Sequence, residues 1–267
     1  MTSLEKLDQL IHATLGELTP GITHEINNPL QFIAGNIHYL NEHFKKISEL
    51  MEGLQQILGT NDKKASRSET TISAADMEKL KKLFSATDPD FSLTEIPLSL
   101  QECFEGINRI SDITDAVRKI STGRESDDCN VNELVSACMI LIQNKLKYAA
   151  RVTLSLCPQN PVINCFRNQI FLVIMIILKK SLSNLLTIKK NSQHGWLGEI
   201  ILSVAIEDNK VNITISDNAI VQSWHDKTNE NLNLLSEMEN IIEEHNGEII
   251  MTENSDGSIY RLFFPLK

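Results

Sequence analysis

The residues with the clearest capacity for chemistry are a histidine, a carboxylate and an amide in one short segment: His24, Glu25 and Asn28. A neutral imidazole is a nucleophile, and an adjacent carboxylate can accept its ring proton and orient it. Asn28 lies one helical turn after His24, on the same face of a helix. The apolar residues Ile22 and Ile26 place His24 roughly 160–200° from their own side, toward solvent. A solvated surface histidine would give the same local pattern.

The alternative of a metal site finds little support in the sequence. A zinc-protease H-E-x-x-H motif is excluded because residue 28 is asparagine. The other histidines are scattered, and no pair has metal-ligand spacing with carboxylate support. The cysteines are odd in number and contain no C-x-x-C pair, which predicts reduced, structural thiols. They are Cys103, Cys129, Cys138, Cys157 and Cys165.

The wider segment around His24 resembles a known phosphoacceptor box. Residues 24–30 read HEINNPL, with GEL upstream at 16–18 and QF downstream at 31–32. This is similar to the box of bacterial two-component sensor histidine kinases. The resemblance implies that His24 accepts a phosphoryl group and that Glu25 assists its deprotonation. It also implies that Asn28 helps to position a water during dephosphorylation of a partner.

Long helices must position this segment. Apolar residues recur every three or four positions through residues 15–58, which predicts a helix with a seam buried against other helices. The polar stretch 59–75 predicts a mobile loop, and a short helix follows at 76–86. A second stripe predicts a helix over 94–121, with Pro97 in its first turn. Two such hairpins make a four-helix bundle, so we expect a homodimer.

The segment Thr19-Pro20-Gly21 interrupts the first stripe, and two interpretations stay open. A new helix could start there, with Thr19 as N-cap and Pro20 at its first position. His24 would then lie near the positive end of the helix dipole, which favours a phosphoryl anion. Alternatively the proline only kinks one longer helix.

The pattern changes around residues 123–128, and the remainder alternates between helices and strands. Asp208-Asn209-Lys210 predicts a hairpin turn, and Asn246-Gly247 predicts the stop of a helix. The predicted helices are 131–147, 168–187 and 232–245, and the predicted strands are 151–156, 199–206, 211–216, 249–252 and 258–264. This order predicts an α+β fold with helices on one face of a mixed sheet.

The resemblance to histidine kinases extends over both parts. Residues 95–121 look like the second dimerisation helix, and 130–148 and 198–218 look like the opening helix and central hairpin of the ATP-binding domain. The resemblance therefore implies a helical-hairpin dimerisation and phosphoacceptor domain over 1–123, forming a four-helix bundle. It implies a GHKL-like α/β sandwich over 128–267.

Most of the residues that would bind the nucleotide in that second domain are replaced. The asparagine that would hold Mg²⁺ is replaced by Lys180, which has no acceptor atom, and Asn184 one turn later is a weak substitute. The aspartate that would contact adenine is kept as Asp217. Lys179 and Lys180 could contact a phosphate or form a solvated cationic face. Glycines that would let the backbone approach phosphates are replaced by Ala219, Val221, Asn231 and Asn233.

Composition limits where the protein acts. The chain has 267 residues, 25 basic and 35 acidic, and a net charge of −10, which disfavours nucleic-acid binding. No apolar run reaches the roughly 18 residues that span a bilayer, and the N-terminus lacks a signal-peptide core. Only 23 residues precede His24. We therefore expect a cytoplasmic protein without a membrane contact, and no sensor domain before His24.

These observations predict a phosphorelay histidine phosphotransfer protein. His24 would pass phosphoryl groups between aspartates of response-regulator receiver domains, with no cofactor of its own. One alternative is an atypical but active histidine kinase, which would use ATP and Mg²⁺. Another is a non-catalytic pseudokinase that pairs with a histidine kinase or sequesters a response regulator.

Overall fold

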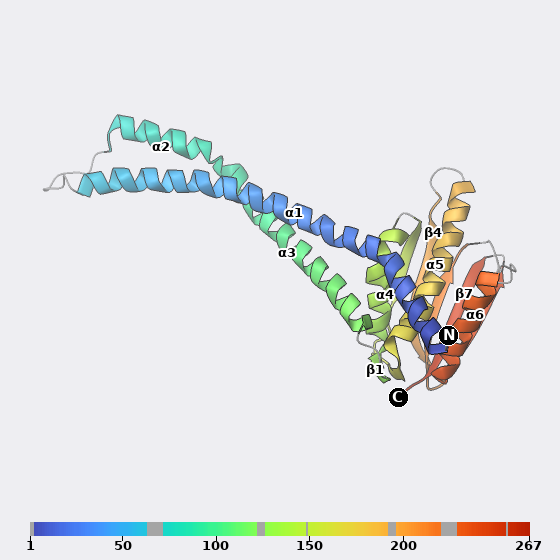
Figure 1. The fold of residues 1–267 in the computed structure, drawn as a ribbon. Coiled ribbons are helices and arrows are strands. Elements are labelled where there is room, and N and C mark those ends of the chain that lie inside the picture. The colour runs from blue at the N-terminus through green and yellow to red at the C-terminus, as the bar shows by residue number, and fades with distance from the viewer. Residues whose placement is uncertain are drawn as a thin grey trace. The chain divides into compact units, whose positions relative to one another are not determined.

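The computed structural model describes residues 3–62, 72–121, 126–147, 149–191, 196–219, 229–254 and 256–267. Its contacts define two compact units, one made of Met1–Glu25 with Asp112–Lys267 and the other of Ile26–Ser111. The helices α1 (Ser3–Asp62) and α3 (Pro89–Ser121) contribute to both units (Figure 1). The domain division between 1–123 and 128–267 stays a prediction, and residues 122–125 lie outside the described residues.

Helix α1 runs without interruption through Pro20. The interpretation that a new helix begins at Thr19 is therefore wrong, and His24 lies about six turns from the N-terminal end of α1 rather than in a second turn. An interior proline removes only one backbone hydrogen bond, which a 60-residue helix packed along its length can absorb. Residues 59–62 and 74–75 are also helical, although a loop was predicted over 59–75; residues 63–71 of that loop lie outside the described residues.

Helix α2 (Ala74–Ala86) confirms the short predicted helix, and the Ser73 hydroxyl caps it by accepting the Asp76 backbone N–H at 3.1 Å. Helix α3 confirms the second stripe but begins at Pro89. Pro97 therefore lies in the helix interior, and its prediction as a first-turn residue is wrong. Pro89 already occupies the start of α3, where its fixed φ suits a helix.

In the unit of residues 26–111, α1 and α3 form the expected antiparallel hairpin. The Asn36 amide donates to the Ser99 carbonyl at 3.3 Å and to the Glu102 carboxylate at 2.9 Å. Nearer the tip, the His43 ring is hydrogen-bonded to the Ser92 hydroxyl at 3.0 Å. From the first contact to the second, the residue number rises from 36 to 43 on α1 and falls from 99 to 92 on α3. The two helices therefore run antiparallel.

The other unit contains a five-stranded mixed sheet in the order β2-β4-β5-β7-β6. Only β2 and β4 pair in parallel. Asp208 and Asn209 form the two-residue turn between β4 and β5, both with positive φ, as the sequence predicts. The strands are β2 (Ala150–Ser155), β4 (Gly198–Glu207), β5 (Lys210–Asp217), β6 (Glu248–Asn254) and β7 (Gly257–Pro265).

Helices α4 (Val131–Leu146), α5 (Arg167–Asn191) and α6 (Asn229–Glu244) cover one face of this sheet (Figure 1). Alternate residues of the strands point into the core beneath them, as with Ile200 and Leu202 of β4. The mixed α+β fold is thereby confirmed. Within the described residues, the segment Arg167–Lys190 is long and apolar enough to cross a membrane, contrary to the expectation that no such run exists; 72% of its most apolar window is buried in the structure.

A second, two-stranded sheet was not predicted. Strand β1 (Asp127–Asn130) pairs antiparallel with β3 (Val162–Cys165). Each strand has four residues, and β1 reads DDCN, so no alternation of apolar and polar residues marks either strand. Their pairing joins the segment before α4 to the strand before α5.

Candidate phosphoacceptor site and the ATPase-like domain

His24 lies on an exposed position of α1, while its neighbour Glu25 is only 3% exposed. Consecutive residues of a helix point about 100° apart, so one can face solvent while the next faces the interior. The imidazole is thus open to a partner, as the sequence predicts. Burial of the Glu25 carboxyl was not foreseen, because burial depends on which neighbour covers that side of the helix.

One turn later, Asn28 is half-buried and Pro29 is buried. The unit boundary falls after Glu25, so these two residues belong to the hairpin unit. There α3 comes close at Gly106, where a side chain would meet Ile33 at 3.1 Å and Pro29 at 3.4 Å. A glycine at this position of α3 therefore allows the two helices to pack tightly beside the end of the phosphoacceptor-like box.

Asp217 ends β5 and is almost fully buried, with 6% of its surface exposed. One carboxylate oxygen accepts the Ser181 hydroxyl at 2.5 Å, and the other accepts the Ala219 backbone N–H at 2.9 Å. Burial raises the pKa of Asp217, and these hydrogen bonds oppose that rise. The carboxylate therefore closes a local Asx turn and fastens β5 to α5.

Two further contacts hold the chain in place around Asp217. The Asn218 side chain accepts the Glu199 backbone N–H at 2.8 Å, which holds the end of β5 against the start of β4. Gly257 has φ of +132°, and a Cβ there would lie 1.9 Å from the Asp217 carbonyl oxygen. Only glycine permits this approach, so Gly257 serves the packing of β7 on β5.

The other residues of the degraded nucleotide motifs lie on helices or outside the described residues. Lys179 and Lys180 are half-buried on α5, and Asn184 one turn on is 3% exposed. Asn231 and Asn233 lie in the first turn and a half of α6 rather than in a loop, because the helix already begins at residue 229. Val221 lies outside the described residues. Within the described residues, no group of three or more His, Cys, Asp or Glu side chains could hold a metal ion.

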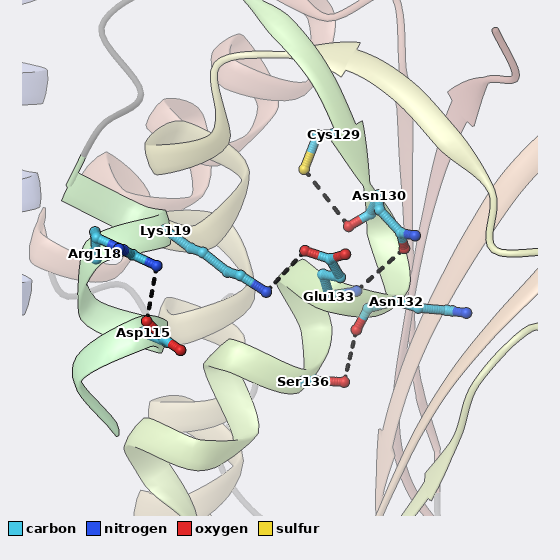
Figure 2. Close-up of polar contacts among 8 residues, drawn as sticks. All are labelled: Asp115, Arg118, Lys119, Cys129, Asn130, Asn132, Glu133 and Ser136. Atoms are coloured by element: carbon cyan, nitrogen blue, oxygen red, sulfur yellow. Dashed lines mark hydrogen bonds and ion pairs between the residues drawn. The ribbon is translucent and has the colours of Figure 1, made fainter. Parts of the chain in front are cut away.

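A cleft of about 340 Å³, lined by both polar and apolar side chains, lies between the last turns of α3, the first turns of α4 and the loop after β2. Figure 2 shows Lys119 of α3 reaching Glu133 of α4, with Nζ and Oε2 2.9 Å apart. This hydrogen bond lowers the pKa of Glu133. Asn132, which is buried, donates to the Cys157 carbonyl at 2.7 Å and so fixes the loop that forms one wall.

The residues of this cleft were not found by sequence reasoning. Asp112, Asp115 and Lys119 lie outside the apolar stripe of residues 94–121. The side chains on the opposite wall of the cleft follow the change of pattern near residue 125. The charged side chains largely satisfy one another, since Arg118 also pairs with Asp115 at 2.9 Å. The cleft is a mixed-charge surface rather than an anion or cation site.

No family model matches the chain. A sensor-protein candidate of Shewanella frigidimarina is 24% identical over 271 residues, covering 95% of this chain and 37% of that protein. The chain thus spans little more than a third of the length of this relative.

Among solved structures, the chain is similar to histidine kinases. Acinetobacter baumannii histidine kinase AdeS matches with a TM-score of 0.42 and 12% identity, over 85% of this chain and 98% of that one. The catalytic domain of histidine kinase ThkA matches with a TM-score of 0.42 and 17% identity, over 53% of this chain and 96% of that one.

Proposed function

We propose that the chain is a two-component phosphorelay protein in which His24 passes phosphoryl groups between receiver aspartates, without using ATP itself. The observation that carries this proposal is a contrast between two sites. The candidate nucleophile His24 is exposed on a continuous helix, whereas Asp217, the aspartate kept from the nucleotide site, has both carboxylate oxygens bonded within the chain. A cytoplasmic location fits partners of this kind.

In this proposal the main task of the chain is to position the His24 imidazole for attack. A neutral His24 imidazole would attack the phosphorus of a receiver's aspartyl phosphate in line, and the receiver would supply its own metal. Glu25, whose carboxyl is buried in the structure, would have to turn toward the ring to hold the proton-bearing nitrogen and stabilise the imidazolium that forms. Asn28, one turn away, would position a water when the phosphoryl group is released to solvent. An exposed imidazole on a 60-residue helix suits a partner that docks from outside.

We also propose a homodimer formed by the hairpin unit. Five apolar residues of α1 are spaced seven apart, and each is about half exposed or more. A heptad repeat of exposed apolar side chains is typical of a seam that a second helix covers. A matching set lies on α3. These residues are Leu30, Ile37, Phe44, Met51 and Leu58 of α1, and Leu93, Leu100, Phe104 and Ile107 of α3.

The direct test is phosphate uptake from two donors. The purified chain is incubated with a receiver domain labelled at its aspartate, and separately with radiolabelled ATP and Mg²⁺. We expect label from the receiver and none from ATP. Label from ATP would establish the kinase alternative instead, and no label from either source would favour the non-catalytic pseudokinase that binds a kinase or a regulator.

His24→Gln is the decisive variant, and His38→Gln is its matched control, because both histidines are exposed on α1. We expect His24→Gln to lose uptake completely and His38→Gln to retain it. Both variants should unfold within about 0.5 kcal/mol of the wild type, since exposed side chains contribute little to stability. Equal uptake by both variants would overturn the assignment of His24.

A further inference from the structure

Two cysteines lie side by side on the two-stranded sheet. Cys129 on β1 and Cys165 on β3 are each 1% exposed. The register pairs Cys129 with Ile163 and Asp127 with Cys165, so both thiols project from the same face as diagonal neighbours. The two side chains are hydrogen-bonded to each other. Figure 2 shows the Cys129 sulfur directed toward the Asn130 carbonyl, 3.8 Å away.

The two thiols differ in their readiness to ionise. The hydrogen bond from Cys165 lowers the pKa of Cys129, and the guanidinium of Arg167 at the start of α5 acts in the same direction. The same hydrogen bond raises the pKa of Cys165. Of the two thiols, Cys129 therefore ionises more readily, which suits the attacking member of such a pair, with Cys165 as the resolving member.

We propose that Cys129 and Cys165 are a redox-modification site at which a peroxide converts the two thiols into one disulfide that links β1 to β3. The Cys129 sulfur attacks a peroxide oxygen, the O–O bond breaks, and the departing oxygen leaves as water, with a sulfenic acid on Cys129. The Cys165 sulfur then attacks the Cys129 sulfur, the S–O bond breaks and a second water leaves. Two thiols lose two electrons, and one hydrogen peroxide becomes two waters.

The surrounding structure allows this reaction. A two-stranded sheet is marginally stable, so local opening of β1 gives a small oxidant access to the buried sulfurs. Diagonal α-carbons are about 7–8 Å apart in such a ladder, slightly beyond the usual disulfide range of about 4.4–6.8 Å. Forming the bond therefore draws the two strands together. The bond ties the segment that leads into α4 to the strand that leads into α5.

Two other cysteines, Cys138 and Cys157, have surroundings that differ from those of this pair. Cys138 is fully buried on α4, and burial raises its pKa. The Cys157 thiol donates to the Gln159 side chain at 2.8 Å. In a reducing compartment a disulfide is typically transient and regulatory, so the pair would rest reduced and form its bond only under oxidation.

The test uses the full chain treated with hydrogen peroxide. Free thiols are blocked with N-ethylmaleimide, the protein is digested with trypsin and a glutamate-specific protease, and linked peptides are mapped by mass spectrometry. Cleavage after Glu133 separates Cys129 from Cys138, and fragmentation of the linked peptide separates Cys157 from Cys165. We expect a Cys129–Cys165 link that dithiothreitol removes.

Serine variants sharpen the result. The link should be absent from Cys129→Ser and Cys165→Ser and present in Cys138→Ser and Cys157→Ser. A link through Cys138 or Cys157, or five blocked thiols per chain after peroxide treatment, would overturn the proposal. The wild-type map decides the question even where a variant fails to fold, and it does not depend on phosphotransfer by His24.

Discussion

Truncating Ile37 tests the proposed dimer most directly. Ile37 lies in the middle of the exposed heptad of α1, with 57% of its surface exposed. Full burial of an isoleucine side chain contributes about 1.5–3 kcal/mol, so covering its exposed part would contribute roughly 1–1.5 kcal/mol. A two-fold interface contains the residue twice, which doubles the effect. Ile37→Ala should therefore weaken the dimer by about 2–3 kcal/mol, or roughly 30- to 150-fold in Kd.

Sedimentation equilibrium over a range of concentrations measures this change, with circular dichroism to verify that the helices are retained. Ile201→Ala is the matched control, because Ile201 is the same residue type, is 46% exposed and lies on the sheet of the other unit. The control should dimerise like the wild type. A wild-type chain that stays monomeric at tens of micromolar, or an equal weakening by both variants, would refute the reasoning.

Two stability predictions concern buried polar groups. Because burial raises the pKa of Asp217, the folded state holds its proton more tightly than the unfolded state, and its contribution to stability is lost as pH rises from about 4 through the raised pKa. Asp217→Asn can keep both hydrogen bonds and has no proton to lose in this range. In thermal unfolding from pH 4 to pH 8, the melting temperature of the variant should therefore rise relative to that of the wild type. A difference in melting temperature that does not change with pH would contradict this. His245 accepts the Phe166 backbone N–H at 3.0 Å and is hydrogen-bonded to the Ile241 carbonyl at 2.6 Å. His245→Ala should reduce the free energy of unfolding by about 2–4 kcal/mol in urea titration, and a loss below 1 kcal/mol would show that these bonds are replaced.

The local elements of this protein could be predicted from its sequence, because their signals are local. Apolar residues at three- and four-residue steps predicted α1 and α3, and Asn246-Gly247 predicted the end of α6, where Asn246 takes a positive φ. The exposure of the His24 imidazole also follows from spacing alone, whereas the box around it is a resemblance to a known family. Each of these features depends on residues within a few turns of one another.

The tertiary structure alone decided the features that depend on distant partners. Whether Pro20 and Pro97 end a helix or lie inside one depends on packing along the whole helix. Which half of the α1 stripe is buried in the chain, and which half is left exposed, depends on where α2 and α3 lie. The pairing of β1 with β3, which brings Cys129 to Cys165, joins segments more than 30 residues apart. Asp217 at the end of β5 likewise accepts a hydrogen bond from Ser181 of α5. No periodicity in the sequence carries that information, since side-chain pairing at long range is determined only when the core closes.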